Sequence, residues 1–183
     1  RAMLRGALQI ATRGRVPARD WQFQTGASGR PSVAAGLPQV SFSLSKSEAV
    51  SAIAVSTRAA VGVDVEGLDE QVDESLISCF ASPRERAALG AGRGGETSRD
   101  FLKLWTLKEA YAKMLGVGLS ADFARLEFSL EPVRFLGAEP VGLRTWTMTF
   151  EGKPCQLSLA FRPAATAQID AQFLSSERLP EAC

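Results

Sequence analysis

The feature that constrains this fold most is a helical repeat of apolar residues over positions 101–115. Six apolar side chains fall at helical intervals on one face and need a core to cover them: Phe101, Leu104, Trp105, Tyr111, Ala112 and Leu115. Ser98 and Asp100 are typical of a helix start, and Gly116 and Gly118 are typical of a helix end. The pattern therefore predicts one long, partly buried helix around which the rest of the chain must pack.

A second, polar face of the same helix carries Thr106, Glu109 and Lys113 at positions i, i+3 and i+7. Glu and Lys four residues apart are common on solvated helices, which they stabilise by about 0.2–0.5 kcal/mol. Taken alone, this pair therefore indicates no more than a solvated helix surface.

An acidic segment upstream, residues 60–66, gives the polar face a second interpretation. Valines alternate there with Gly62, Asp64 and Glu66, a pattern typical of a β-strand. In a strand, the two carboxylates would point to the same side, roughly 7 Å apart. They would repel each other unless a cation lay between them, so the segment favours a cation site.

The acidic segment and the polar helix face together predict a metal site. If Glu109 came alongside Asp64 and Glu66, the three carboxylates would form the hard oxygen environment that suits Mg²⁺. Mg²⁺ often completes its shell with substrate phosphates. Lys108 and Lys113 would then be available as phosphate partners.

Composition excludes several classes of chemistry. The 183-residue chain has a formal net charge of +1 and no histidine, which rules out Ser-His-Asp and Cys-His catalysis and His-ligated metals. The small net charge predicts no general attraction for nucleic acid or for an anionic membrane, and no apolar run is long enough to cross a bilayer. Cys79, Cys155 and Cys183 are widely spaced, which favours a reducing cytoplasm over a disulfide framework.

Shorter patterns predict the remaining elements. Helical and alternating patterns predict helices at 1–12, around 76–80 and from the capping box Ser82-Pro83-Arg84-Glu85 to about 89, and strands at 40–45, 50–56, 126–130, 146–150 and 157–161. Turn residues predict loops at 26–38, 67–73 and 90–95. We interpret the last, glycine-rich loop as a surface loop in preference to a phosphate cradle, because no strand precedes it and Gly-Lys-Ser/Thr is absent.

The strands after the central helix predict an antiparallel sheet with one buried face and helices packed on that face, an α+β fold. Strand-plus-helix units in each half permit a pseudo-symmetric arrangement of two lobes. We expect a shortened first lobe over 1–60, a second lobe with the metal site over 61–175, and a flexible tail over 176–183.

Two segments of the chain also carry a family resemblance. They are Gly62–Glu66 (GVDVE) and Trp105–Lys113 (WTLKEAYAK). As a pair they resemble the signature of the 4′-phosphopantetheinyl transferases, nearest the Sfp type. Members transfer the phosphopantetheine arm of coenzyme A to a serine of an acyl or peptidyl carrier protein and release 3′,5′-ADP, in pathways such as polyketide and fatty acid biosynthesis. The resemblance implies their fold, coenzyme A as co-substrate, Mg²⁺ as cofactor and a carrier protein as partner.

The resemblance implies roles for the matching residues. Asp64, Glu66 and Glu109 would bind Mg²⁺, which also grips the pyrophosphate of coenzyme A. Glu109, or a water that it orients, would be the base for the carrier serine, and Lys113 would meet the leaving group, so Glu109, Lys113 and Asp64 form the expected catalytic set. Lys108 and Lys113 would contact coenzyme A.

Two further stretches resemble coenzyme A-binding elements of the family. Gly29-Arg30-Pro31 resembles its Gly-Lys-Pro element, with Arg30 in place of lysine. Residues 42–47 (FSLSKS) resemble its Asn-Leu-Ser-His-Ser stretch, which implies that Ser45 and Lys46 hold the 3′-phosphate. Lys46 keeps a cation where the family has histidine but loses its directionality, and the alternative interpretation is a solvated turn lysine.

The N-terminal part departs from the family. Only 28 residues precede Gly29, fewer than in stand-alone Sfp-type enzymes. We expect either a domain of a larger synthase or a first lobe that lacks a part and is completed by self-association. Two other functions stay open: a carrier-protein docking module without turnover, and a different Mg²⁺-dependent phosphoryl-transfer enzyme on the same scaffold.

Overall fold

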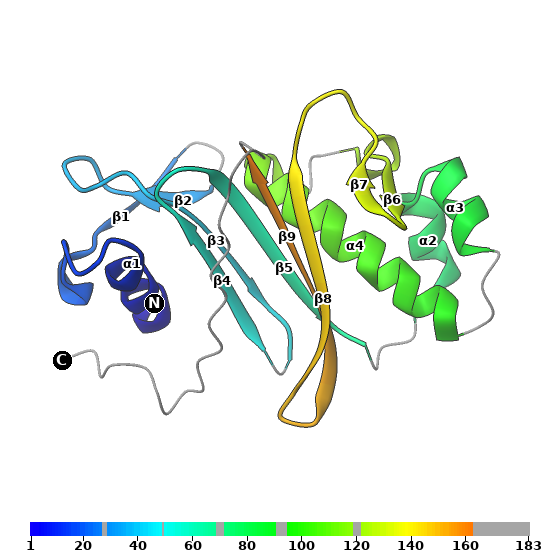
Figure 1. The fold of residues 1–183 in the computed structure, drawn as a ribbon, viewed down its shortest axis with the longest axis horizontal. Helices are drawn as coiled ribbons and strands as arrows, with labels where there is room; N and C mark the ends of the chain where they lie inside the picture. The colour runs from blue at the N-terminus through cyan, green and yellow to red at the C-terminus, as the bar shows by residue number, and fades with distance from the viewer. Residues whose placement is uncertain (27–28, 49, 69–71, 91–94, 119–121, 163–183) are drawn as a thin grey trace.

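The structure is a computed structural model that describes residues 1–26, 29–48, 50–68, 72–90, 95–118 and 122–162. Figure 1 shows its elements, which are in chain order α1 (Ala2–Ala11), η1 (Ala18–Asp20), β1 (Phe23–Thr25), β2 (Pro31–Val33), β3 (Ser41–Lys46), β4 (Ser51–Ser56), β5 (Ala60–Gly67), α2 (Glu74–Phe80), α3 (Pro83–Leu89), α4 (Gly95–Leu115), η3 (Phe123–Arg125), β6 (Phe128–Leu130), β7 (Val133–Phe135), β8 (Gly142–Phe150) and β9 (Lys153–Arg162). Within these ranges, no helix is both long and apolar enough to cross a membrane.

A three-stranded antiparallel sheet, in the order β5-β9-β8, forms the centre of the fold. Helix α4 packs on β5 and β9, and the antiparallel β3–β4 hairpin packs against β5 on the side of the N-terminal elements (Figure 1). Mixed helices and antiparallel strands confirm the predicted α+β class. Strand β5, which carries the acidic segment, therefore lies between the N-terminal elements and α4.

Helix α4 packs on one face of this sheet, as predicted. On that face, Ser158 of β9 is buried beneath α4, where its hydroxyl shares a hydrogen bond of 2.8 Å with that of Thr106. On the opposite face, Leu157 and Leu159 lie beside their strand partners Val65 and Val63 and are partly buried.

The strand predicted at 126–130 belongs to a separate hairpin, because β6 pairs with β7 and not with β8 or β9. The Phe128 ring of β6 packs on Tyr111 of α4 at a centroid distance of 5.8 Å and on Phe135 of β7 at 5.1 Å. These aromatic contacts hold the hairpin on the helix.

Two other boundaries differ from the prediction. Part of the segment expected to be a loop, 26–38, forms β2, which pairs with β1 in the register Thr25↔Pro31. Helix α4 begins at Gly95, earlier than the predicted start at Ser98. In this additional turn, the Thr97 hydroxyl donates to the Leu89 carbonyl at 3.4 Å.

Several predicted elements are confirmed. Helix α1 and the hairpin strands β3 and β4 lie at the predicted positions, and β8 and β9 include the predicted strands but each begins four residues earlier. The capping box at the start of α3 is present, since the Glu85 backbone N–H donates to Ser82 Oγ and the Ser82 N–H donates to Glu85 Oε2. At the end of α4, Gly116 has a φ of +77°, the left-handed conformation that favours glycine.

The division into two lobes stays a prediction. One apolar cluster lies among the N-terminal elements around Leu8, and another lies beneath α4. A third cluster joins Ala52 of β4 to Val65 of β5, across the expected boundary between residues 60 and 61. The expected tail at 176–183 and most of the glycine-rich loop, 91–94, lie outside the described residues.

Candidate active site

Asp64 and Lys113, which are 49 residues apart in the sequence, form an ion pair between β5 and α4. Lys113 Nζ donates to Asp64 Oδ1 at 2.6 Å. The Ser45 hydroxyl of β3 donates to the same Oδ1 at 2.7 Å, and Lys113 Nζ donates to Ser45 Oγ at 3.1 Å. Asp64 is only 2% exposed. Three elements thus contribute to one charged group, Ser45, Asp64 and Lys113, which we call the Asp64 cluster.

Gly62 explains why α4 can approach β5 closely enough to form this cluster. A Cβ at Gly62 would lie 1.9 Å from the Ala110 carbonyl oxygen and 2.4 Å from the Met114 backbone nitrogen. Residues two apart in a strand share a face, so Gly62 and Asp64 both point toward α4. The acidic motif therefore combines a bare backbone position for the helix with a carboxylate for its lysine.

Glu109 lies near the Asp64 cluster and is partly buried. Burial raises the pKa of the Glu109 carboxyl, the charge of Asp64 raises it further, and Lys113 opposes both effects. Glu109 Oε1 and Asp64 Oδ2 are buried, and neither atom has a hydrogen-bond partner in the described part of the chain. Buried polar atoms are normally paired, so these two oxygens are available to a cation or a proton donor.

Glu66 lies on the same face of β5 as Asp64, as predicted, but its surroundings differ. Trp105 Nε1 donates to Glu66 Oε1 at 3.4 Å. Among the described residues, no three His, Cys, Asp or Glu side chains are grouped in a way that could hold a metal ion. The expected ligand set of Asp64, Glu66 and Glu109 is therefore not assembled in this structure, although Asp64 and Glu109 keep oxygens without partners.

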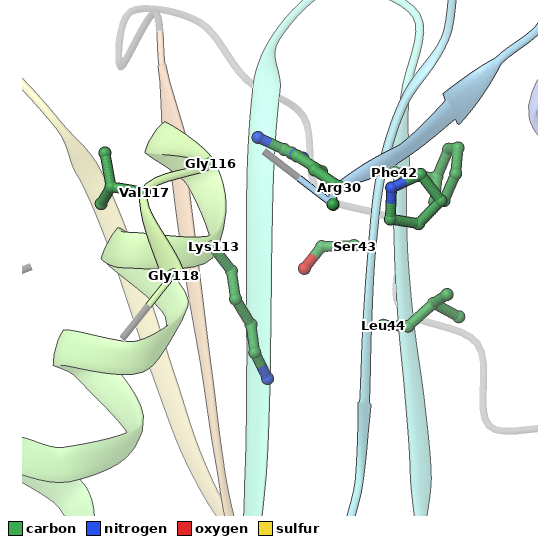
Figure 2. A pocket seen from close by; sticks show the side chains of 10 residues that line it. Arg30, Phe42, Ser43, Leu44, Lys113, Gly116, Val117 and Gly118 are labelled. Atoms are coloured by element: carbon green, nitrogen blue, oxygen red, sulfur yellow. The ribbon is translucent and has the colours of Figure 1, made fainter. Parts of the chain in front are cut away.

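A pocket of about 550 Å³ opens beside Lys113. Its lining residues come from the start of β2 and the segment before it, from β3, and from the end of α4 and the residues that follow it: Gly29, Arg30, Pro31, Phe42, Ser43, Leu44, Lys113, Gly116, Val117 and Gly118. Figure 2 shows the Lys113 side chain extending from α4 across β5, with Arg30 above it and the β3 residues opposite. The pocket combines two cations with an apolar wall, which is suited to an organic phosphate.

Arg30 reaches this pocket from outside the central sheet and contacts the end of α4. Its Nη1 donates to the Met114 carbonyl at 3.1 Å and its Nη2 donates to the Val61 carbonyl at 3.5 Å. A cation at a helix C-terminus is favourable because the last carbonyls carry partial negative charge. A Cβ at Gly116 would lie 2.8 Å from Arg30 Nη1, so glycine there gives the guanidinium room.

Lys108 lies elsewhere, which contradicts the expectation that it contacts coenzyme A. It is 1% exposed, and its Nζ donates to Glu85 Oε2 and the Phe123 carbonyl, both at 2.6 Å, and to the Phe80 carbonyl at 2.8 Å. Burial lowers the pKa of the Lys108 ammonium, and the bond to Glu85 opposes this shift. With three protein acceptors, all three N–H groups are used. Lys108 therefore ties α4 to α2, α3 and η3.

Lys46 lies outside the pocket. It is exposed at the end of β3 and is not among the residues that line the pocket, as the alternative of a solvated lysine implies. Leu44, two residues earlier in β3, is 42% exposed and lines the pocket beside Phe42. The lining residues Ser43 and Val117 were not predicted. The alternation of Ser41, Ser43 and Ser45 was the available signal for a polar strand edge.

The comparisons with known proteins agree with the two sequence motifs. The family model described as the 4′-phosphopantetheinyl transferase superfamily matches residues 60–150, which include Asp64, Glu66, Glu109 and Lys113. This chain belongs to the 4′-phosphopantetheinyl transferase superfamily. The predicted family is thus confirmed.

Curated relatives carry the same description. The chain is 35% identical over 57% of its length to the 4′-phosphopantetheinyl transferase HetI of Nostoc sp., covering 42% of that protein. It is 33% identical over 69% of its length to the L-aminoadipate-semialdehyde dehydrogenase-phosphopantetheinyl transferase of Eremothecium gossypii, covering 47% of that protein. The chain is 28% identical over 68% of its length to the 4′-phosphopantetheinyl transferase of Bacillus subtilis, covering 57% of that protein. The chain thus spans about half the length of these relatives.

Two solved structures overlap with part of the chain. Both are of ACPS from Chronobacterium ammoniagenes, one without ligand and one in complex with CoA, and each covers 56% of this chain and 96% of its own. Their TM-scores are 0.41, at 18% and 20% sequence identity.

Proposed function

We propose that this chain transfers the 4′-phosphopantetheine arm of coenzyme A to a serine of an acyl or peptidyl carrier protein and releases 3′,5′-ADP, with Mg²⁺ as cofactor. The observation that carries the proposal is the position of buried Asp64, partly buried Glu109 and the ammonium of Lys113 beside a pocket with a second cation, Arg30. Membership of the superfamily supports the same reaction.

The proposed reaction exchanges one bond at phosphorus for another. The new bond joins the carrier serine oxygen to the β-phosphorus of coenzyme A, and the bond from that phosphorus to the bridging oxygen breaks. Glu109, whose pKa is raised by burial and by Asp64, is the proposed acceptor of the serine proton. A positioned base typically contributes about 10²- to 10⁴-fold in rate.

Lys113 is the proposed partner of the leaving 3′,5′-ADP. Its ammonium has three N–H donors, of which two go to Asp64 and Ser45. The salt bridge to Asp64 holds the Lys113 charge at the pocket wall, where a phosphate oxygen can take the remaining donor. Arg30, on the other side of the same pocket, is the proposed ligand of the 3′-phosphate, and its planar fork suits that group.

The residues present fit a bound Mg²⁺. Asp64 Oδ2 and Glu109 Oε1 are buried oxygens without partners in the described residues, and Mg²⁺ is commonly bound by one or two carboxylates together with substrate phosphates. Glu66 is the proposed third ligand, and a shift of its carboxylate away from Trp105 would be needed. When bound, the ion would neutralise charge on the pyrophosphate.

The biological setting is also part of the proposal. We propose a cytoplasmic enzyme, because Cys79 and Cys155 carry free thiols. The carrier protein would belong to a fatty acid or polyketide pathway. Completion of the first lobe by self-association or within a larger synthase also stays a prediction.

Intact-protein mass spectrometry of an apo carrier protein, incubated with this chain, coenzyme A and Mg²⁺, tests the proposal. We expect a mass gain equal to one phosphopantetheine arm, and no gain when a chelator is added. Glu109→Gln should reduce the rate by about 10²-fold or more. Asp100→Asn is the matched control, since Asp100 is exposed on the same helix.

Each outcome separates the candidate functions. Binding of carrier protein without a mass gain would favour the docking module, and nucleotide turnover without carrier protein would favour another phosphoryl-transfer enzyme. A Glu109→Gln variant with normal transfer would refute the role of Glu109 as base.

A further inference from the structure

We infer that Ser45 is a positioning residue, whose hydroxyl holds Asp64 and Lys113 in place, accepts a third hydrogen bond from the Val65 N–H, and does not bind the 3′-phosphate. The catalytic part of this inference rests on the proposed function. The structural part, a bond network that links β3 to β5 and α4, can be tested without any activity.

Strand β3 meets β5 through its serine side chains. The two strands belong to different sheets, and three serines at alternate positions of β3 accept hydrogen bonds from alternate backbone N–H groups of β5. These bonds are Val61 N to Ser41 Oγ at 3.1 Å, Val63 N to Ser43 Oγ at 3.1 Å and Val65 N to Ser45 Oγ at 3.4 Å. We call Ser41, Ser43 and Ser45 the serine ladder. The ladder gives the edge of β5 side-chain acceptors in place of a backbone partner.

Within the ladder, Ser45 is distinguished by its contacts with Asp64 and Lys113. Its bond to the Val65 N–H is the longest of the three, and its hydroxyl lies 2.7 Å from Asp64 Oδ1 and 3.1 Å from Lys113 Nζ. In the described part of the chain, Ser41 makes no hydrogen bond to Asp64 or to Lys113. Ser41 and Ser45 thus share a residue type, a strand face and a contact with β5, and differ in the contact with the Asp64 cluster.

Three partners occupy the donor and both lone pairs of the Ser45 hydroxyl. A serine hydroxyl has one O–H donor and two lone pairs. The Ser45 donor goes to Asp64 Oδ1, and its lone pairs face Lys113 Nζ and the Val65 N–H. A phosphate accepts hydrogen bonds, so it could bind Ser45 Oγ only by taking the donor away from Asp64. That exchange would remove one of the two hydrogen bonds that the buried Asp64 Oδ1 accepts and leave Lys113 Nζ as its remaining donor.

Loss of the Ser45 hydroxyl should disturb the groups that take part in the proposed reaction. Ser45 bridges an acid from β5 and a cation from α4, so loss of its hydroxyl frees both side chains to shift. Displacement of a positioned group by about 1 Å can cost as much as 10²-fold in rate. Ground-state affinity for coenzyme A, by contrast, should depend little on a hydroxyl that does not touch it.

Steady-state kinetics of Ser45→Ala, Ser45→Thr and Ser41→Ala test the catalytic part. We expect Ser45→Ala to lower kcat by about 10- to 100-fold while KM for coenzyme A changes less than about twofold. Ser45→Thr keeps the hydroxyl and should retain kcat, and Ser41→Ala should change neither constant. A raised KM with unchanged kcat in Ser45→Ala would show a phosphate ligand and overturn the inference. If Ser45→Ala and Ser41→Ala had the same kcat and KM, Ser45 would be only a contact between strands. That result would also overturn the inference.

A double-mutant cycle on unfolding tests the structural part. The shifts of the denaturation midpoint should be non-additive for Ser45→Ala with Lys113→Met, and additive for Ser41→Ala with Lys113→Met. Additivity in both cycles would overturn the inference. If the unmodified chain shows no transfer, the proposed function fails, while the cycle still decides whether Ser45 holds Lys113.

Discussion

Replacing Gly62 by alanine tests the close approach of α4 to β5 on which the site depends. The added Cβ would lie 1.9 Å from the Ala110 carbonyl oxygen, 2.4 Å from the Met114 nitrogen and 3.0 Å from the Met114 Cα. Van der Waals contacts are optimal at about 3.5–4.0 Å, so α4 would have to move away by roughly 1.5–2 Å. The obstructing atoms are backbone, and no side-chain rotamer change can relieve the overlap.

The expected cost follows from this geometry. Overpacking of a core typically costs about 1–3 kcal/mol and occasionally more, and a clash with helix backbone belongs at the upper end. We expect Gly62→Ala to lower the free energy of unfolding by about 3 kcal/mol or more. The same shift would lengthen the Lys113 Nζ to Asp64 Oδ1 distance from 2.6 Å, so any remaining folded protein should have lost transfer activity.

Denaturant unfolding of Gly62→Ala and Gly67→Ala measures this cost. Gly67 is the matched control: it lies in the same strand, and a Cβ there would meet nothing within 4 Å. We expect Gly67→Ala to change stability by no more than about 1 kcal/mol. A Gly62→Ala variant that also stays within about 1 kcal/mol of the unmodified chain would show that α4 does not pack this closely.

Two further predictions concern charged groups outside the pocket. Lys108→Met should lower the free energy of unfolding by about 3–5 kcal/mol, because it leaves buried Glu85 without its ion-pair partner, and coenzyme A affinity measured by calorimetry on the remaining folded protein should stay unchanged. Weaker coenzyme A binding by Lys108→Met without a loss of stability would indicate that Lys108 contacts coenzyme A after all. Asp73 accepts a hydrogen bond from the Ser75 N–H at 2.7 Å, which lowers the pKa of its carboxyl. Because the folded pKa lies below the unfolded value of about 3.9, the stabilisation is complete above that pH and is lost as pH falls through the folded pKa. The stability difference between the unmodified chain and Asp73→Ala should therefore shrink in acid, and a difference that stays constant down to low pH would contradict this cap.

The sequence by itself determined the features that depend on spacing within one element. A two-residue period places Asp64 and Glu66 on one side of β5, and a 3.6-residue period places Glu109 and Lys113 on one face of α4. The capping box at Ser82 is equally local, because its donor and acceptor lie in the same turn. Such features follow from bond geometry and need no knowledge of neighbouring elements.

Only the tertiary structure decided which element covers each face. Lys108 and Glu109 are adjacent in the sequence, yet one is held by Glu85 and the other lies near Asp64. Neighbouring residues of a helix point about 100° apart, so their partners depend on what packs on each side. The contact from Arg30 to Met114 spans 84 residues, and no local period encodes it. The spacing of residues sets the direction of a side chain, whereas packing between distant segments decides whether that direction leads to the core, to solvent or to the site.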